Sequence, residues 1–441
     1  MFSPLRHAGY RHLFTAQVAA LLGTGMATVA LGLLAHDLAG ANAGEVLGMA
    51  LAIKMIAYIG VAPIAGAFAN RVPRRALLVT VDAIRAAVAL CLPFVDQIWQ
   101  VYVLIFVLQS ASAAFTPTFQ ATIPDVLPDE RDYTRALSLS RLAYDMESLT
   151  SPILAAALLT VISYHWLFSG TAIGFIASAM LVVSTVLPRP APAKDAGGIY
   201  DKTTRGTRIY LKTPRLRGLL ALTLAAAAAS AMVIVNTVVI VRDLGLTQRD
   251  VALTLAAFGA GSITAALTLP RVLDRVSDRA VMLVAATVLT LALAALAVAG
   301  ATMAPGLHYW YVLLGGWLVM GIAYSASVTP SGRLLRRSAH AEDRPALFAA
   351  QFALSHVCWL VCYPLVGQLG AKVSMAAAFA GMAVIAMIGT VAALWLWPAH
   401  DPEIVPHDHE DLAADDEHRR VHAEGGHAFV IDRRHPKWPR E

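Results

Sequence analysis

Long apolar segments separated by short polar ones run along almost the whole chain. Twelve of them approach the length of a helix that crosses a bilayer, which needs about 20 mostly apolar residues. Their expected bounds are 12–36, 46–69, 76–95, 98–121, 138–161, 165–187, 217–241, 249–270, 280–303, 308–330, 345–369 and 374–397. The pattern predicts an all-α membrane protein with twelve transmembrane helices.

Short polar motifs of the first half recur in the second half, in the same order. Asn70-Arg71-Val72-Pro73-Arg74-Arg75 returns as Asp274-Arg275-Val276-Ser277-Asp278-Arg279, Thr116-Pro117 as Thr329-Pro330, and Glu130-Arg131 as Asp343-Arg344. A duplicated bundle with the substrate path between its halves is the architecture of many secondary transporters. We therefore expect two pseudo-symmetric six-helix halves.

Proline and glycine mark the expected boundary between the halves. Pro188, Pro190, Pro192 and Gly197-Gly198 precede a basic stretch, and such residues interrupt helices. We predict an N-terminal half over 1–187, a cytoplasmic linker over 188–216 and a C-terminal half over 217–398. A polar tail follows over 399–441, in which Ala428-Phe429-Val430-Ile431 is apolar enough to dock on another part of the protein.

Composition and charge support a membrane location. Hydrophobic residues make up 58% of the chain and charged residues 14%, against about 25% charged in soluble domains. Most Lys and Arg residues fall on the loops of one side, which places both termini in the cytoplasm by the positive-inside rule. We expect a monomer spanning a bacterial inner (plasma) membrane, with the lipid bilayer as its main partner. The positive net charge is explained by this topology and does not indicate nucleic-acid binding.

The segment Gly66-Ala67-Phe68-Ala69-Asn70-Arg71-Val72-Pro73-Arg74-Arg75 resembles a signature of the major facilitator superfamily. That signature has a glycine, an Asp-Arg pair, a second glycine and further basic residues between helices two and three. Here Asn70 replaces the aspartate and Pro73 the glycine, whereas the second copy keeps its acid. The resemblance implies a cytoplasmic latch between helices, formed by Arg71, Arg74 and Arg75, with Asp274 and Arg275 in the second copy.

Asp82 and Arg85 are three residues apart and so lie on one face of a helix. We expect an internal ion pair that steadies the latch, with contact to substrate as the alternative.

Three further motifs resemble the exporter branch that includes enterobactin-type siderophore exporters and nickel-resistance permeases. They are Ser3-Pro4-Leu5-Arg6, Asp82-x-x-Arg85 and Ile123-Pro124-Asp125. This resemblance implies efflux. Relatives often carry an acid after the glycine of helix one, whereas here Gly23 is followed by Thr24.

Charged residues inside a membrane are costly and are therefore functional candidates. Lys54 is expected to face a central cavity, where it either contacts substrate or has only a structural role. Asp145 and Glu147 are candidates for proton coupling, because a desolvated carboxylate can take up a proton near neutral pH. Residues two apart point to different faces of a helix, and Asp145 alternatively pairs with Arg141 four residues before it.

Soft metal ligands occur in one apolar segment of the second half. Cys358 and Cys362 share a helix face, and His356 is displaced from it. An imidazole with two thiols suits a soft or borderline metal, but isolated polar residues in an apolar helix more often serve packing.

The tail carries half of the 14 histidines of the chain. Candidate metal ligands are His407, His409, His418, His422 and His427, interleaved with carboxylates. This donor set suits nickel, cobalt, zinc or copper(II), and nickel-resistance permeases similarly end in histidine-rich tails. The alternative is a solvated polar tail without a metal.

These observations predict a proton-coupled exporter that works by alternating access, with divalent metal ions such as nickel or cobalt as the leading substrate hypothesis. The alternative substrate is an organic compound, a siderophore or hydrophobic drug, with Lys54 contacting an anionic group. A membrane-bound metal sensor is a third hypothesis. The sequence contains no P-loop, no His-Glu-x-x-His and no Gly-x-Ser-x-Gly motif, so we expect no enzyme activity. We also expect no cofactor, apart from a divalent metal as substrate or tail ligand.

Overall fold

The computed structural model describes residues 2–39, 43–69, 72–187, 198–401, 404–405, 427–432 and 434–439. The first half of the chain contains a short 3-10 turn, η1 (Ser3–Arg6), and then six long helices, with a second turn, η3 (Leu92–Phe94), after the third. These helices are α1 (Ala8–Ala39), α2 (Ala43–Phe68), α3 (Arg74–Cys91), α4 (Ile98–Val126), α5 (Glu130–Leu158) and α6 (His165–Val183).

The second half repeats this arrangement, with two additional short helices. It comprises α7 (Ile199–Lys212), α8 (Pro214–Asp243), α9 (Gln248–Leu273), α10 (Asp278–Thr302), α11 (Leu307–Val328), α12 (Ser331–Arg337), α13 (Arg344–Lys372) and α14 (Met375–Leu396). Two short strands, β1 (Ile404–Val405) and β2 (His427–Ala428), follow and pair antiparallel.

Eleven described segments are long and apolar enough to cross a membrane. The remaining predicted segment is α5, which is 29 residues long but carries several charged residues. It begins at Glu130, ahead of the expected residue 138, because Asp129 caps its first turn by accepting a hydrogen bond from the Asp132 amide at 2.8 Å. The all-helical membrane fold expected from the apolar pattern is confirmed.

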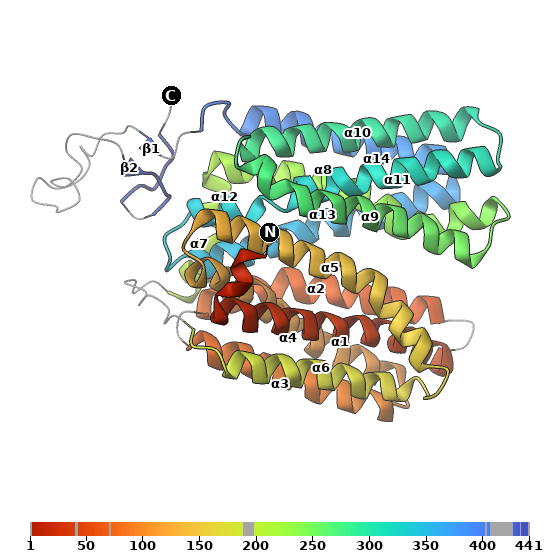
Figure 1. The fold of residues 1–441 in the computed structure, drawn as a ribbon, viewed down its shortest axis with the longest axis horizontal. Helices are drawn as coiled ribbons and strands as arrows, with labels where there is room; N and C mark the ends of the chain where they lie inside the picture. Colours follow the sequence, from red (N-terminus) through yellow and green to blue (C-terminus); the bar gives the residue numbers. More distant parts are fainter. Residues whose placement is uncertain are drawn as a thin grey trace, which may run out of the picture.

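The two halves form adjacent bundles whose helices run in roughly the same direction (Figure 1). Within the first bundle, α1 and α3 pack on α6, and α2 and α3 pack on α4. Within the second, α9 packs on α11, and α14 packs on α8 and α10. Between the bundles, α2 and α4 contact α13, and α5 contacts α9. A substrate path between the bundles would therefore be bordered by α2, α5, α9 and α13.

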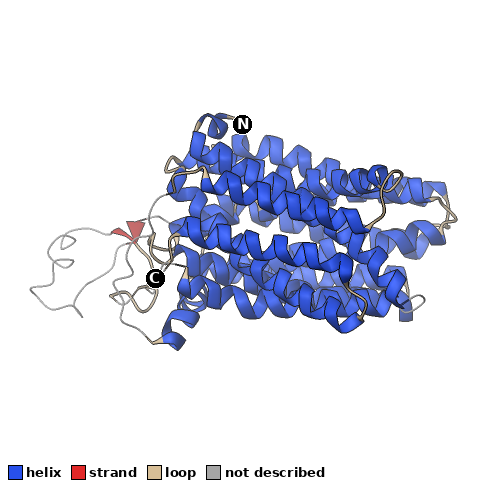
Figure 2. Ribbon diagram, turned by 90° about the horizontal axis from the view of Figure 1, so that it is seen from below, coloured by secondary structure: helices blue, strands red, loops and turns tan. Residues whose placement is uncertain are grey.

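The basic stretch predicted as part of a linker forms a helix, α7, and α8 already begins at Pro214. Helix α7 packs against both α2 and α13. A Cβ atom on Gly206 would lie 2.0 Å from the Ala346 carbonyl oxygen, so this close approach requires glycine. The helix break predicted from the proline and glycine residues therefore ends at Gly198, where α7 is about to begin. Helix α7 and the strands lie at one end of the bundle (Figure 1), and Figure 2 shows the N-terminus toward the same end. We call this end the linker end.

The last part of the chain docks on the linker end of the second bundle. Phe429, Val430 and Ile431 are buried, and Phe429 and Ile431 belong to the apolar core of that bundle. The ring of Trp438 lies 5.0 Å from that of Phe429 and beneath the guanidinium of Arg215. The docking expected for residues 428–431 is thus confirmed for residues 429–431.

Candidate functional site between the two halves

The centre of the interface between the halves combines charged side chains of the first bundle with aromatic rings from both bundles. Lys54 of α2 is half-buried, and its Nζ lies 5.4 Å from the ring centroid of Tyr58. His356 of α13 packs edge-on against Tyr58 at 4.6 Å between ring centroids. Lys54 also acts electrostatically on both His356 and Glu147. Residues from α2, α5 and α13 therefore gather in one place.

Glu147 of α5 is half-buried and packs against α1. A Cβ atom on Gly25 of α1 would lie 2.6 Å from the Glu147 Oε1 atom. Within the described part of the chain, Glu147 interacts with Lys54 over a distance and forms no salt bridge. This carboxylate thus approaches α1 next to Thr24, the position at which relatives often carry an acid.

Asp145 has different surroundings, as expected for a neighbour two residues away. It is buried and forms an ion pair with Arg141 one turn earlier, with a contact of 3.3 Å from Arg141 Nε. It also accepts a hydrogen bond from the Ser262 hydroxyl of α9. The Arg141 guanidinium lies 4.8 Å from the centroid of the Tyr324 ring of α11. The pairing with Arg141, which the spacing allowed, is present and connects the two halves.

His356, Cys358 and Cys362 do not come together. The Nδ1 atom of His356 lies 2.7 Å from the Phe352 carbonyl oxygen, and its ring contacts aromatic side chains of α2 and α13. Both cysteines are buried in the apolar core of the second bundle. Among the residues that the structure describes, no group of three His, Cys, Asp or Glu side chains is placed to hold a metal.

Of the latch residues, Arg74 takes part in a contact between the halves. Arg74 at the start of α3 and Arg344 at the start of α13 both bind Asp125 of α4, the latter at 2.7 Å. Arg75 is exposed, and Arg71 lies outside the described residues.

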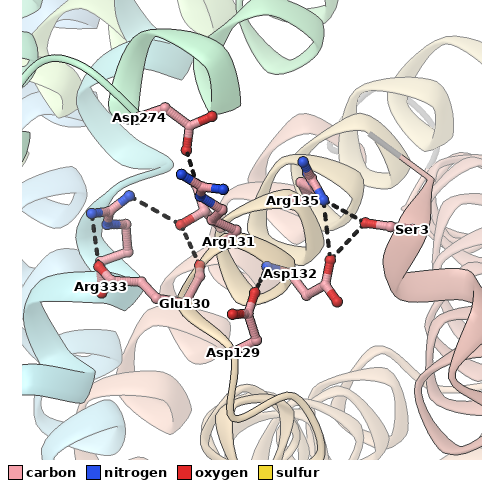
Figure 3. A network of polar contacts seen from close by, with 9 residues as sticks. Ser3, Asp129, Glu130, Arg131, Asp132, Arg135, Asp274 and Arg333 are labelled. Carbon is pink, nitrogen blue, oxygen red and sulfur yellow. Dashed lines mark hydrogen bonds and ion pairs between the residues drawn. The ribbon is translucent and has the colours of Figure 1, made fainter.

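A second set of ion pairs joins the halves at the same end (Figure 3). Arg333 of α12 contacts Glu130 of α5 at 2.8 Å, and Arg131 approaches Asp274 at 3.8 Å. Arg275, the neighbour of Asp274, is exposed. Sequence reasoning assigned no role to Asp125, Glu130, Arg333 or Arg344. The recurrence of Glu130-Arg131 as Asp343-Arg344 is the signal from which two of them could have been found.

Asp82 and Arg85 form the expected ion pair, but away from the latch. Asp82 is fully buried and accepts a hydrogen bond from Ser178 of α6 at 2.7 Å. The Arg85 guanidinium stacks between the rings of Phe115 and Phe175, at 4.1 and 4.4 Å from their centroids. Because all of these partners are inside the first bundle, the pair holds α3, α4 and α6 together, and its effect on the latch arginines stays a prediction.

The halves are in close contact at the linker end. A Cβ atom on Gly66 of α2 would lie 2.6 Å from the Ala349 Cβ atom of α13, so the two helices touch there. The ion pairs of Asp125 and Glu130 lie beside this contact. The structure therefore shows the conformation in which the linker end of the interface is closed.

Four of the tail histidines predicted as metal ligands, His407, His409, His418 and His422, lie outside the described residues. His427 belongs to β2, and only its backbone is described. Metal binding by the tail therefore stays a prediction.

Residues 13–238 and 218–429 each match the Major Facilitator Superfamily. The chain belongs to this superfamily. It is a multi-pass membrane transporter and not an enzyme.

Two curated relatives of this superfamily are similar over part of the chain. The uncharacterized MFS-type transporter YfiS of Bacillus subtilis (strain 168) is 27% identical over 165 residues, which cover 37% of this chain and 38% of the relative. Macrolide efflux protein A of Streptococcus pyogenes is 24% identical over 149 residues, which cover 33% of this chain and 36% of the relative. The matched part is thus well under half of either relative. The expected place in the enterobactin-exporter and nickel-permease branch stays a prediction.

Solved structures of the superfamily share the fold. A bacterial homologue of the iron transporter ferroportin, in an outward-facing state, superposes with a TM-score of 0.74 at 13% identity, covering 88% of this chain and 98% of that one. The human organic anion transporter MFSD10 (TETRAN) superposes with a TM-score of 0.73 at 11% identity, and the match covers 88% of this chain and 99% of that one.

Proposed function

We propose that this transporter exports an organic compound by alternating access, in exchange for protons that Glu147 carries. The linker end is the cytoplasmic end in this proposal, and the structure represents the state closed toward the cytoplasm. The observation that carries the proposal is the placement of Glu147. It is half-buried beside Lys54 and α1 without a salt bridge among the described residues, whereas Asp145 is engaged by Arg141 and Ser262.

A coupling carboxylate must change its protonation within the transport cycle. A carboxylate held in a direct ion pair with arginine resists protonation, because the positive charge stabilises its ionised form. Among the described residues, the cation that acts on Glu147 is the more distant Lys54, so a proton can compete with it. Differential proton affinity in the two conformations is what couples protonation to transport.

The chemistry of the central site favours an organic substrate over a metal ion. Tyr58, Phe352, His356 and Trp359 form a continuous set of ring contacts between α2 and α13. Aromatic side chains provide apolar area for an organic molecule, and Lys54 offers a cation for an anionic group. This site lacks thiolate or carboxylate groups positioned as a ligand set in the described residues. The similarity to macrolide efflux protein A supports testing a macrolide first.

The test is proton movement in everted vesicles on addition of a macrolide. We expect the wild type to release protons when substrate is added and the Glu147→Gln variant to lose this response. Glu147→Asp keeps a carboxylate and should retain part of the proton release. Comparing the two variants separates a loss of coupling from an effect on packing. Proton release by Glu147→Gln at the wild-type rate would overturn the assignment of Glu147.

Metal export is the second candidate, because the tail segment His407-Asp408-His409-Glu410-Asp411 combines imidazole and carboxylate donors. It predicts lower nickel and cobalt accumulation in cells that express the full chain, and loss of this effect in a chain that ends at Ala399. No change in metal accumulation with either chain would reject it. Nickel bound to purified protein without any flux in vesicles would indicate a sensor instead.

A further inference from the structure

A polar cavity of about 300 Å³ lies at the linker end, where the two halves meet. Helices α5, α10, α12 and α13 surround it. The side chains that line it are Glu130, Tyr133, Asp278, Arg333, Arg336, Arg337 and Arg344. Four arginines thus share one small space with two carboxylates.

The acids of the cavity neutralise only one of these arginines directly. Arg333 contacts both Glu130, at 2.8 Å, and Asp278, at 3.2 Å. Arg337 and Arg344 pair with acids that do not line the cavity, Asp401 and Asp125.

Arg336 pairs with no carboxylate in the described part of the chain. It donates to the Pro128 carbonyl oxygen and lies 5.2 Å above the ring of Tyr133. The cavity therefore has an excess of positive charge.

Several donors at the cavity are buried without an acceptor. Within the described residues, Arg336 Nη1, Tyr133 Oη, Arg337 Nε and Arg344 Nε have no hydrogen-bond partner. Tyr133 is fully buried, and its hydroxyl faces α12, where a Cβ atom on Gly332 would come within 2.7 Å of it. Buried donors without acceptors are costly, and four of them around one space suit a ligand with several acceptor oxygens.

We infer that this cavity binds a phosphate group and that its binding stabilises the conformation closed at the linker end. Phosphate oxygens accept the charge-assisted, bidentate hydrogen bonds that arginine donates. Of the side chains that can donate to a phosphate here, Tyr133 belongs to the first half and the four arginines belong to the second, whereas the carboxylate of Glu130 is held by Arg333. A phosphate that binds the arginines and Tyr133 together loses the Tyr133 hydrogen bond when the halves separate, so its binding shifts the equilibrium toward closure. This site is distinct from the central one and does not depend on the identity of the exported compound.

Two sources supply the same chemistry: the headgroup of an anionic phospholipid and a soluble phosphate. The first arm of the test compares full-length protein in nanodiscs of phosphatidylcholine with and without phosphatidic acid. The second arm adds inorganic phosphate, or chloride at equal ionic strength, to the phosphatidylcholine nanodiscs. The readout is the spin-label distance between cysteines introduced at the exposed positions Val72 and Val276, in a background where the native cysteines are replaced by serine.

We expect one of the two phosphate sources to increase the population with the short, closed distance. Arg336→Gln should raise the concentration of the phosphate source needed for half-maximal closure about tenfold, as expected for the loss of a charge-assisted hydrogen bond. The matched control is Arg217→Gln, which removes an exposed arginine at the same end but outside the cavity. Tyr133→Phe removes the donor that the first half supplies, without changing charge, and should reduce the closing response.

Closure by phosphatidic acid alone would assign the site to a lipid headgroup, and closure by inorganic phosphate would assign it to a soluble ligand. Equal responses of wild type and Arg336→Gln would overturn the site, as would equal losses in Arg336→Gln and Arg217→Gln. If Arg336→Gln does not fold, Arg336→Lys keeps the charge but not the bidentate geometry, and an undiminished response would overturn the inference. Because export is not the readout, failure of the proposed function would leave this result intact.

Discussion

At the scale of single residues, the structure separates two carboxylates that are close in sequence. The spacing of Asp145 and Glu147 indicates that they lie on different helix faces, but it does not show which groups surround each carboxylate. Ser262 and Tyr324, which complete the surroundings of Asp145 and Arg141, come from the other half. Local sequence carries no information on such long-range partners, so the candidate residues could be predicted and their division of roles could not.

The Asp145–Arg141 pair leads to a stability prediction. Replacing Asp145 by Asn leaves the charge of Arg141, whose side chain is 16% exposed, without its carboxylate, and breaking such a largely buried pair typically costs about 3 kcal/mol. We expect a clearly lower melting temperature in detergent for this variant, and a smaller loss when Arg141→Gln is added to it. Glu147→Gln, two residues further on, breaks no ion pair within the part of the chain that the structure describes and serves as the control. Melting of Asp145→Asn at the wild-type temperature would show that the pair does not stabilise the fold.

At the scale of elements, the apolar periodicity predicted the long helices well, because their length and hydropathy are set by the bilayer. It missed α7, a short amphipathic helix that packs against α2 and α13. Docking of the tail segment was predicted only from its apolar residues. The ion pair between His340 and Asp432 joins two residues far apart in the chain and has no local sequence signal.

The docked tail segment should depend on pH. The hydrogen bond to Asp432 raises the pKa of His340 above its usual 6.5, an effect that nearby Asp343 and Glu342 reinforce. Burial opposes ionisation of Asp432, but the hydrogen bonds from His340 and the His435 backbone hold its pKa well below the usual 3.8. A raised histidine pKa stabilises docking fully below pH 6.5, and this contribution is lost as the pH rises through the raised value.

The aspartate contributes in the opposite direction, since its contribution is present above pH 3.8 and is lost at lower pH. Docking should therefore be strongest in mildly acidic solution and weaken in alkaline solution. Quenching of Trp438 fluorescence by a soluble quencher, measured against pH, reports the release of the segment. His340→Gln should abolish the alkaline step, whereas the same change at the exposed His308 should leave it unaltered. An alkaline step that persists in His340→Gln would assign it to another group.

At the scale of the whole molecule, the internal repeat predicted two halves, and the structure shows how they meet. The contacts at the linker end include ion pairs centred on Asp125 and Glu130, and hydrogen bonds from α12 to Pro128 and Thr134. They are joined by a small apolar cluster of Ala62, Ala113 and Ala349. Ion pairs and hydrogen bonds can break and solvate when the halves separate, whereas a large apolar interface would oppose opening. The interface at this end is therefore suited to a conformational equilibrium rather than to permanent closure.

Asp125 should control that equilibrium, because it receives Arg74 from its own half and Arg344 from the other. Replacing it by Asn removes the charge that holds two arginines together, and their mutual repulsion then favours separation. We expect the distance between spin labels at positions 72 and 276 to shift toward the long, open population in Asp125→Asn. Asp129→Asn, which changes an exposed helix cap on the same side, is the matched control. Arg344→Gln should open the linker end in the same way, and the double variant should open it little further, since both changes remove one interaction between the halves. Fully additive opening in the double variant would mean that Asp125 and Arg344 act through different partners.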